Sequence, residues 1–303
     1  MVFNFLFRFQ FFILLSLALF LPLCSDKKSD VVLEEPKKVL EKELVSELTS
    51  KYSHIKIYNE GSKRFLCFVR DNGDEVVESS IDLIHPEYLQ LKYTQAMFAG
   101  LLLNKKLPLK TLMVGLGGAG MPHFSYHYFP EIEMKIVEID PEIIKLAKNH
   151  FMITEKISKN IINDDIYTYL NRVNDLYEII FMDAFLKPSK TTDETGISYK
   201  LKEKNFYNSL KNHLTKNGMV VFNINQHLDF QKDIHSIQEN FENLYIVNRK
   251  SSGNYIVIAS TNPTKISNLD MESMAQWIDL DRSPNYSFRE LLKDFKDRDS
   301  FLK

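Results

Sequence analysis

The sequence predicts an α/β domain with a parallel sheet that closes on an antiparallel hairpin, and three observations carry this prediction. A glycine-rich loop follows one apolar run, and the next apolar run ends in the acids Glu138 and Asp140. Further apolar runs with the length of buried strands occur at 177–183 and 219–225. Beyond them, a connection of only five residues, typical of a hairpin, separates two β-rich runs, 244–248 and 254–260.

The glycine-rich loop is the first candidate for ligand binding. Gly115, Gly117 and Gly120 fit the pattern G-x-G-x-x-G, and Gly118 adds a fourth glycine. Glycine adopts positive φ and lets the backbone approach a ligand that a Cβ would keep away. A structural turn would explain the loop alone, but the flanking strands and the acids that follow favour cofactor binding.

Carboxylates at strand ends complete the predicted binding site. Glu138 and Asp140 follow Gly120 by 18 and 20 residues, about the distance at which such folds place an acid on ribose hydroxyls. Asp164 and Asp165 follow the third strand, where an acid can accept the adenine amino group, although helix capping also explains them. The pattern fits a dinucleotide, S-adenosylmethionine (SAM) or decarboxylated SAM, and the terminal hairpin favours the SAM type.

From Ser50 to Ser260 the chain resembles the spermidine synthase (polyamine aminopropyltransferase) superfamily, in particular its divergent bacterial spermidine synthase-like members. The resembling stretches include MVGLGGAG at 113–120, VEIDPEIIKLAKNHF at 137–151 and YEIIFMDAF at 177–185. The resemblance implies a Rossmann-like SAM-methyltransferase fold with a small N-terminal β-domain. It also implies transfer of an aminopropyl group from decarboxylated SAM to an amine.

The same resemblance implies roles for individual residues. Glu138 would hold the ribose and Asp165 the adenine amino group, while Tyr93 and Gln95 would line the substrate side. Asp183 would take a proton from the attacking amine, because a protonated amine has no lone pair with which to attack. A simpler interpretation of Asp183 is a cap of the turn that follows its strand.

The chain departs from the family pattern in the substrate region. Family synthases carry an acid in the glycine loop where this chain has Gly118, and a second acid three residues after the catalytic Asp, where it has Leu186. A buried ammonium without a carboxylate partner costs on the order of several kcal/mol. Without the loop acid, the carboxylate of intact SAM meets no repulsion there. Three functions stay open: aminopropyl transfer, SAM-dependent methyl transfer to an unknown small substrate, and non-catalytic nucleotide binding or scaffolding.

Residues 1–24 differ in composition from the rest. The apolar run Phe11–Leu23 follows the single basic residue Arg8. Thirteen residues are short for a transmembrane helix, which needs about 20, and suit the hydrophobic part of a signal peptide. The stretch LPLC at 21–24 resembles a bacterial lipobox and makes Cys24 a lipidation candidate. A lipoprotein, an uncleaved anchor and a cleaved signal stay open, and the first two predict a membrane-associated protein on an undecided face.

The rest of the chain divides by composition. Residues 25–49 are polar and predict a linker followed by a short helix. Residues 50–82 predict a small β-domain over the cofactor pocket, with a hairpin turn at Asp71–Asp74. Residues 83–260 form the predicted α/β domain, and 261–303 a charged, partly helical C-terminal tail.

Charge and composition argue against several classes of protein. The formal net charge is −2, with Lys and Arg spread along the chain, which gives no electrostatic footprint for nucleic acid. The eight histidines show no metal-ligand spacing, and two cysteines are too few for a disulfide framework or a zinc site. We therefore predict a small-molecule substrate, an amine under the main interpretation, and no metal. Whether the chain forms a homodimer stays open.

Overall fold

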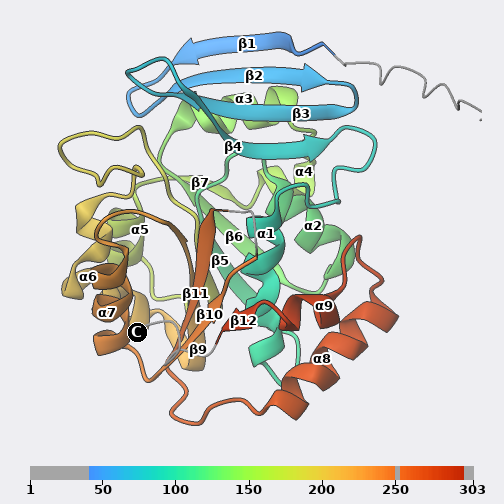
Figure 1. Ribbon diagram of the computed structural model, residues 1–303, viewed down its shortest axis with the longest axis vertical. Helices are drawn as coiled ribbons and strands as arrows, with labels where there is room; N and C mark the ends of the chain where they lie inside the picture. The colour runs from blue at the N-terminus through green and yellow to red at the C-terminus, as the bar shows by residue number, and fades with distance from the viewer. Residues whose placement is uncertain (1–40, 250–252, 297–303) are drawn as a thin grey trace, which may run out of the picture. The chain divides into compact units, whose positions relative to one another are not determined.

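The computed structural model describes residues 41–249 and 253–296, all within one compact unit of the chain, Leu40–Lys303. Two sheets organise these residues (Figure 1): a small antiparallel sheet of four strands, and a mixed sheet of eight strands with helices on both faces. The predicted fold class, a Rossmann-like α/β domain with a small N-terminal β-domain, is therefore confirmed.

The small sheet is built from consecutive antiparallel strands in the order β1-β2-β3-β4. Its strands are β1 (Glu43–Thr49), β2 (His54–Glu60), β3 (Lys63–Val69) and β4 (Glu75–Asp82). At the turn between β3 and β4, Gly73 has a φ of +88° and the Arg70 amide donates to the Asp74 carbonyl at 2.8 Å. The left-handed backbone explains why the sequence has a glycine there.

β1 occupies a segment that the sequence predicted as linker and short helix, within 25–49. For residues 43–49 that prediction is wrong, because pairing with β2 places Val45 and Leu48 against the core. Glu43 and Glu47 remain exposed, as charged residues on an edge strand commonly are. Residues 25–40 lie outside the described part of the chain.

The main sheet has the strand order β12-β10-β11-β9-β8-β5-β6-β7. Its parallel strands are β5 (Lys110–Val114), β6 (Glu133–Glu138), β7 (Ile161–Asn163), β8 (Tyr177–Met182) and β9 (Leu214–Asn225). The strands that join it antiparallel are β10 (Asn243–Val247), β11 (Asn254–Ser260) and β12 (Phe295–Lys296). The pair β10 and β11 is the antiparallel closure that the sequence predicted.

Alternate residues of the central strands face opposite sides of the main sheet. On β8, Ile179 and Phe181 pack into one core cluster, and Ile180 and Met182 into the other. Helices on the first side are α1 (Lys92–Met97), the 3-10 helix η1 (Phe98–Leu103), α2 (Gly120–Tyr128), α3 (Pro141–His150), α4 (Glu155–Ser158), α8 (Asn268–Asp281) and α9 (Phe288–Leu292). Helices on the second side are α5 (Ile166–Arg172), α6 (Lys204–Asn212) and α7 (Phe230–Asn240), seen together at the left of Figure 1.

The C-terminal segment is part of the core. Residues 261–303 were predicted as a charged, partly helical tail. The helices α8 and α9 are present, but Met271 and Ile278 of α8 and Phe288 and Leu291 of α9 are buried. The two-residue strand β12 then pairs with β10. Periodic apolar residues in this charged segment bury one face of each helix, which a composition-based prediction overlooks.

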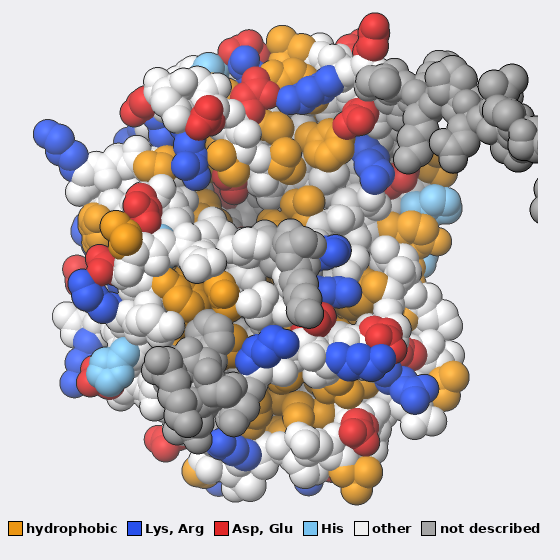
Figure 2. Space-filling view, viewed as in Figure 1, with side chains coloured by type: hydrophobic (Ala, Val, Ile, Leu, Met, Phe, Trp, Pro, Cys, Tyr) orange, Lys and Arg blue, Asp and Glu red, His pale blue; other side chains and the backbone are white. Residues whose placement is uncertain are grey.

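Charged side chains of both signs are interspersed over the face of the molecule seen in Figure 2. Within 41–249 and 253–296, no helix has the length and apolar character needed to cross a membrane. The predicted signal or anchor segment, residues 1–24, and the lipidation candidate Cys24 lie outside those ranges.

Candidate functional site

A cavity of about 150 Å³ lies where the carboxyl ends of β5, β6 and β8 meet the small sheet. Parallel strands end at the same edge of a sheet, so the loops that follow them converge there. A single water needs roughly 10–15 Å³ of such volume, so the cavity has room for a ligand of many atoms. In Figure 1 this edge lies directly below β4.

The start of the glycine loop forms part of the cavity wall, through Gly115, Leu116 and Gly117. Gly115 has a φ of +94°, and a Cβ there would overlap the carbonyl oxygen of Asp183. Gly117 has a φ of +51°, and a Cβ there would overlap the hydroxyl of Ser79 on β4. These two glycines therefore allow both the turn and the close approach of neighbouring backbone and side chains.

Gly118 and Gly120 do not line the cavity. A Cβ at Gly118 would lie 2.8 Å from the Phe151 ring and 3.0 Å from Cβ of Ser79. Gly120 is the first residue of α2. Close packing thus explains the glycine at 118, whereas a Cβ at Gly120 would make only ordinary contacts, and neither residue makes the predicted contact with the cofactor cavity.

Glu138 ends β6 and lines the cavity beside the glycine loop. Its carboxylate accepts hydrogen bonds from the backbone amides of Leu116 and Asp140, both at 2.8 Å. Burial raises the pKa of Glu138 to about 7, although these backbone bonds lower it. Each carboxylate oxygen accepts more than one bond, so Glu138 retains acceptor capacity for a ligand hydroxyl.

Asp140 also lines the cavity, and both of its oxygens have protein partners. One accepts from the amide of Glu142 at 3.0 Å and so caps α3. The other accepts from the hydroxyl of Ser50, in the loop between β1 and β2, at 2.5 Å. Asp140 therefore connects the small sheet to the α/β domain.

Asp164 and Asp165 line the cavity after β7. Asp165 accepts from the amide of Tyr167 at 2.8 Å and caps α5, as one interpretation of the sequence predicted. Asp164 pairs with Arg172 at 2.5 Å. Asp165 therefore both caps α5 and lines the cavity, and Asp164 lines the cavity while it pairs with Arg172.

Asp183 follows β8 directly, and its carboxylate is fixed from two sides. One oxygen accepts from the side-chain amide of Asn223 at 2.8 Å, and the other lies 3.4 Å from the hydroxyl of Tyr93. Asn254 in turn donates to the Asn223 oxygen at 2.9 Å. Burial raises the pKa of Asp183 to about 6, although the bonds from Asn223 and Tyr93 lower it.

Two further residues shape this end of the cavity, and the sequence analysis did not identify them. Asn223 is buried on β9, where the parallel register pairs Met182 with Phe222 and so aligns Asp183 with Asn223. An amide inside the apolar run MVVFNIN was the available signal, because a buried polar side chain needs a partner.

Glu78 is the second residue that the sequence analysis missed. Its neighbours on β4 pair with consecutive residues of β3, Leu66 with Ser79 and Cys67 with Val77. Glu78 is thus the extra residue of a β-bulge, a feature that redirects a side chain. It lines the cavity, and burial together with the charge of Asp183 raises its pKa to about 8, against the charge of Arg70.

Tyr93 lies at the cavity as predicted, but Gln95 does not. The hydroxyl of Tyr93 donates to the backbone carbonyl of Glu78 at 2.9 Å. The Gln95 side chain donates to the Leu89 carbonyl at 3.0 Å and accepts from Arg249 at 2.7 Å. Residues two apart on a helix face different sides, so the substrate-binding role predicted for Gln95 is wrong.

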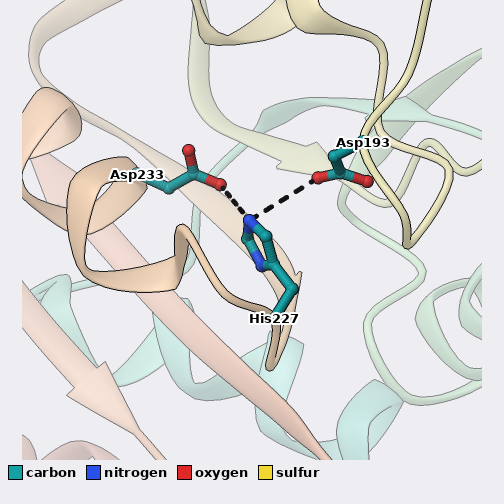
Figure 3. Close-up of side chains that lie close together, drawn as sticks. All are labelled: Asp193, His227 and Asp233. Carbon is teal, nitrogen blue, oxygen red and sulfur yellow. Dashed lines mark ion pairs between the residues drawn. The ribbon is translucent and has the colours of Figure 1, made fainter. Parts of the chain in front are cut away.

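A separate cluster joins Asp193, His227 and Asp233, whose ligand atoms lie within 4.8 Å of one another (Figure 3). His227 Nε2 lies 3.8 Å from Asp193 and 3.2 Å from Asp233. The ammonium of Lys202 pairs with both carboxylates. Burial lowers the pKa of Lys202, but the two carboxylates outweigh it and raise that pKa above its usual value. A permanent cation therefore already balances these acids.

The chain matches a known family over most of its length. Residues 91–280 match the spermine/spermidine synthase domain family. The chain belongs to this family. A polyamine aminopropyltransferase of Neisseria meningitidis is 29% identical over 224 residues, covering 73% of this chain and 81% of that protein.

Solved structures with this fold include relatives and methyltransferases. A probable spermidine synthase from Corynebacterium glutamicum superposes with a TM-score of 0.64 at 19% identity, covering 85% of this chain and 92% of that one. Human methyltransferase-like protein 13 in complex with SAH superposes with a TM-score of 0.57 at 23% identity, covering 65% and 94%. The spermine/spermidine synthase fold is thus shared with SAM-type methyltransferases.

Proposed function

We propose that this chain transfers an aminopropyl group from decarboxylated SAM to an amine. The placement of Asp183 carries the proposal: it is a carboxylate at a strand end, oriented by Asn223 and facing the cavity that the glycine loop borders. Membership of the spermine/spermidine synthase family and the aminopropyltransferase relative support the same reaction.

The charge of the cavity wall suits positively charged reactants. Among the described residues, Lys200 is the one Lys or Arg that lines it. The acids that line it are Glu78, Glu138, Asp140, Asp164, Asp165 and Asp183. A sulfonium donor and an ammonium acceptor both gain from such a wall, and the attraction is stronger where water is excluded.

We expect one end of the cavity to bind the nucleoside and the other end to hold the reacting amine. At one end, Glu138 would accept from the ribose hydroxyls, and Asp164 or Asp165 would accept from the adenine amino group. At the other end, Asp183 would take the proton from the acceptor ammonium. The freed nitrogen lone pair then attacks the carbon attached to the sulfonium, and the C–S bond breaks with its electrons moving to sulfur. The products are a substituted amine and neutral 5′-methylthioadenosine.

Methyl transfer from intact SAM is the second candidate function. The structural likeness to a methyltransferase in complex with SAH favours it. A methyl transfer would leave S-adenosylhomocysteine in place of 5′-methylthioadenosine, so the nucleoside product separates the two reactions.

The test is turnover by the full chain with each donor and a panel of aliphatic mono-, di- and triamines, read by mass spectrometry of the nucleoside product. Asp183→Asn should lower turnover roughly 10²- to 10⁴-fold, because the base is removed. Asp281→Asn, at the exposed end of α8, is the matched control and should leave turnover unchanged. Full activity of Asp183→Asn, or product formed only from SAM, would overturn the proposal.

Membrane association through residues 1–24 is a separate proposal, supported by the apolar run and the LPLC stretch in the sequence. The protein should sediment with membranes when expressed in bacteria. If Cys24 is lipidated, Cys24→Ala should release it or change its migration in a gel. Recovery of the unaltered chain in the soluble fraction would contradict this proposal.

A further inference from the structure

The acid that family synthases carry in the glycine loop has no room here. Residue 118 packs on the Phe151 ring and on Ser79, and even a Cβ would approach them to 2.8 and 3.0 Å. Any longer side chain would displace β4 or Phe151, the residue that follows α3. A carboxylate for this region must therefore come from another element.

Glu78 supplies a carboxylate from β4, directly before Ser79. The β-bulge sets the position of Glu78, and Glu78 lines the same cavity as Asp183 and Tyr93. Within the described residues, no hydrogen bond or ion pair engages its side-chain oxygens, although the hydroxyl of Tyr93 binds its backbone carbonyl at 2.9 Å. Among these described residues, the charge of Arg70 acts on Glu78 without forming an ion pair, and burial disfavours the ionised carboxylate. An ammonium placed beside Glu78 would stabilise that ionised form.

We propose that Glu78 binds the terminal ammonium of the aminopropyl donor and thereby selects decarboxylated SAM over SAM. This inference rests on the proposed function. Decarboxylated SAM ends in an ammonium group alone, whereas SAM carries a carboxylate beside its ammonium. The donor ammonium stabilises the ionised form of Glu78, whereas the second carboxylate of SAM would lie beside two acids, Glu78 and Asp183, and would gain no partner there. Selection against SAM therefore comes here from the small sheet.

Equilibrium binding of decarboxylated SAM, SAM and 5′-methylthioadenosine to the full chain tests this role. The wild type should prefer decarboxylated SAM over SAM. Glu78→Gln should reduce that preference about 10- to 100-fold, because it removes the charge-assisted hydrogen bond to the donor ammonium. Its affinity for 5′-methylthioadenosine, which lacks the aminopropyl chain, should stay within about twofold of wild type.

Two further variants make the result specific. Glu78→Asp keeps the charge on a shorter side chain and should give an intermediate preference, which also serves if Glu78→Gln does not fold. Glu60→Gln, exposed on β2, is the matched control and should behave as wild type. An unchanged preference in the Glu78 variants, or an equal loss of 5′-methylthioadenosine affinity, overturns the inference.

These binding measurements, together with the turnover assay of the proposed function, show which of the two ideas fails. If the wild type turns over decarboxylated SAM and prefers it, but the Glu78 variants keep that preference, only the role of Glu78 fails. If the wild type prefers SAM, the proposed aminopropyl transfer fails with it.

Discussion

Asp183 combines burial with a carboxylate that stays ionised at neutral pH. Burial disfavours the charged form, and hydrogen bonds from Asn223 and Tyr93 stabilise it. The resulting pKa of about 6 lies near the pH at which a base works best, because it is ionised at pH 7 yet still attracts a proton. The sequence placed this acid at a strand end, but it did not reveal the amide that orients it.

The rate of the proposed transfer should depend on pH. The base acts only when ionised, so kcat/KM should rise as the pH increases through about 6, the raised pKa of Asp183. Below that pH the rate should fall about tenfold per pH unit. A steady-state pH profile from 5 to 8 measures this. A rate that is flat across pH 5 to 7 would contradict Asp183 as the base.

The sequence predicts some elements of the fold and the site better than others. The strands of the main sheet, the glycine loop and the acids at strand ends follow from apolar runs and turn residues. Glu78 could not be predicted, because the β-bulge changes which side of β4 its side chain faces, and bulges leave no reliable pattern in one sequence. Gln95 was assigned to the site from its neighbours in sequence, whereas helix geometry turns it away from Tyr93.

The segment between β8 and α6 is held by the cluster around Lys202. Its first residues, through Leu186, line the cavity, and Asp193 within it pairs with Lys202. Lys202 also pairs with Asp233 of α7. The cluster therefore fastens the cavity-lining segment to the second face of the sheet.

Lys202→Met should destabilise the fold by about 3–5 kcal/mol, because it leaves two largely buried carboxylates without their cation. Chemical denaturation at pH 7 measures the change. Lys232→Met removes an exposed ion pair on α7 and is the matched control, with little expected effect. Equal effects of the two variants would show that the cluster does not stabilise the segment as described.

Two hydrogen bonds attach the part of the chain with the small sheet to α3 of the α/β domain. Both ends of α3 are bound to it: Asp140 at the start accepts from Ser50, and the His150 carbonyl at the end accepts from Arg64 at 2.6 Å. The sequence predicted the two parts and their order. It could not predict these contacts, because they join residues 86 and 90 positions apart.

Ser50→Ala should raise the KM for the donor and lower the unfolding free energy by roughly 1.5–3 kcal/mol, since a hydrogen bond to a carboxylate is lost. Turnover at saturating donor should change little, because Asp183 is untouched. Ser62→Ala removes a 3.1 Å bond to Asp82 beside the small sheet and is the matched control. A KM that is unaltered in Ser50→Ala would show that this attachment does not shape the cavity.

The acidic wall of the cavity has a consequence for the end of the catalytic cycle. During the proposed transfer the sulfonium becomes an uncharged thioether, so the nucleoside loses the charge by which the ionised acids of the cavity wall attract it. The product nucleoside should consequently dissociate from the cavity faster than the donor does. Chemistry at the sulfur would in this way also empty the cavity for the next round.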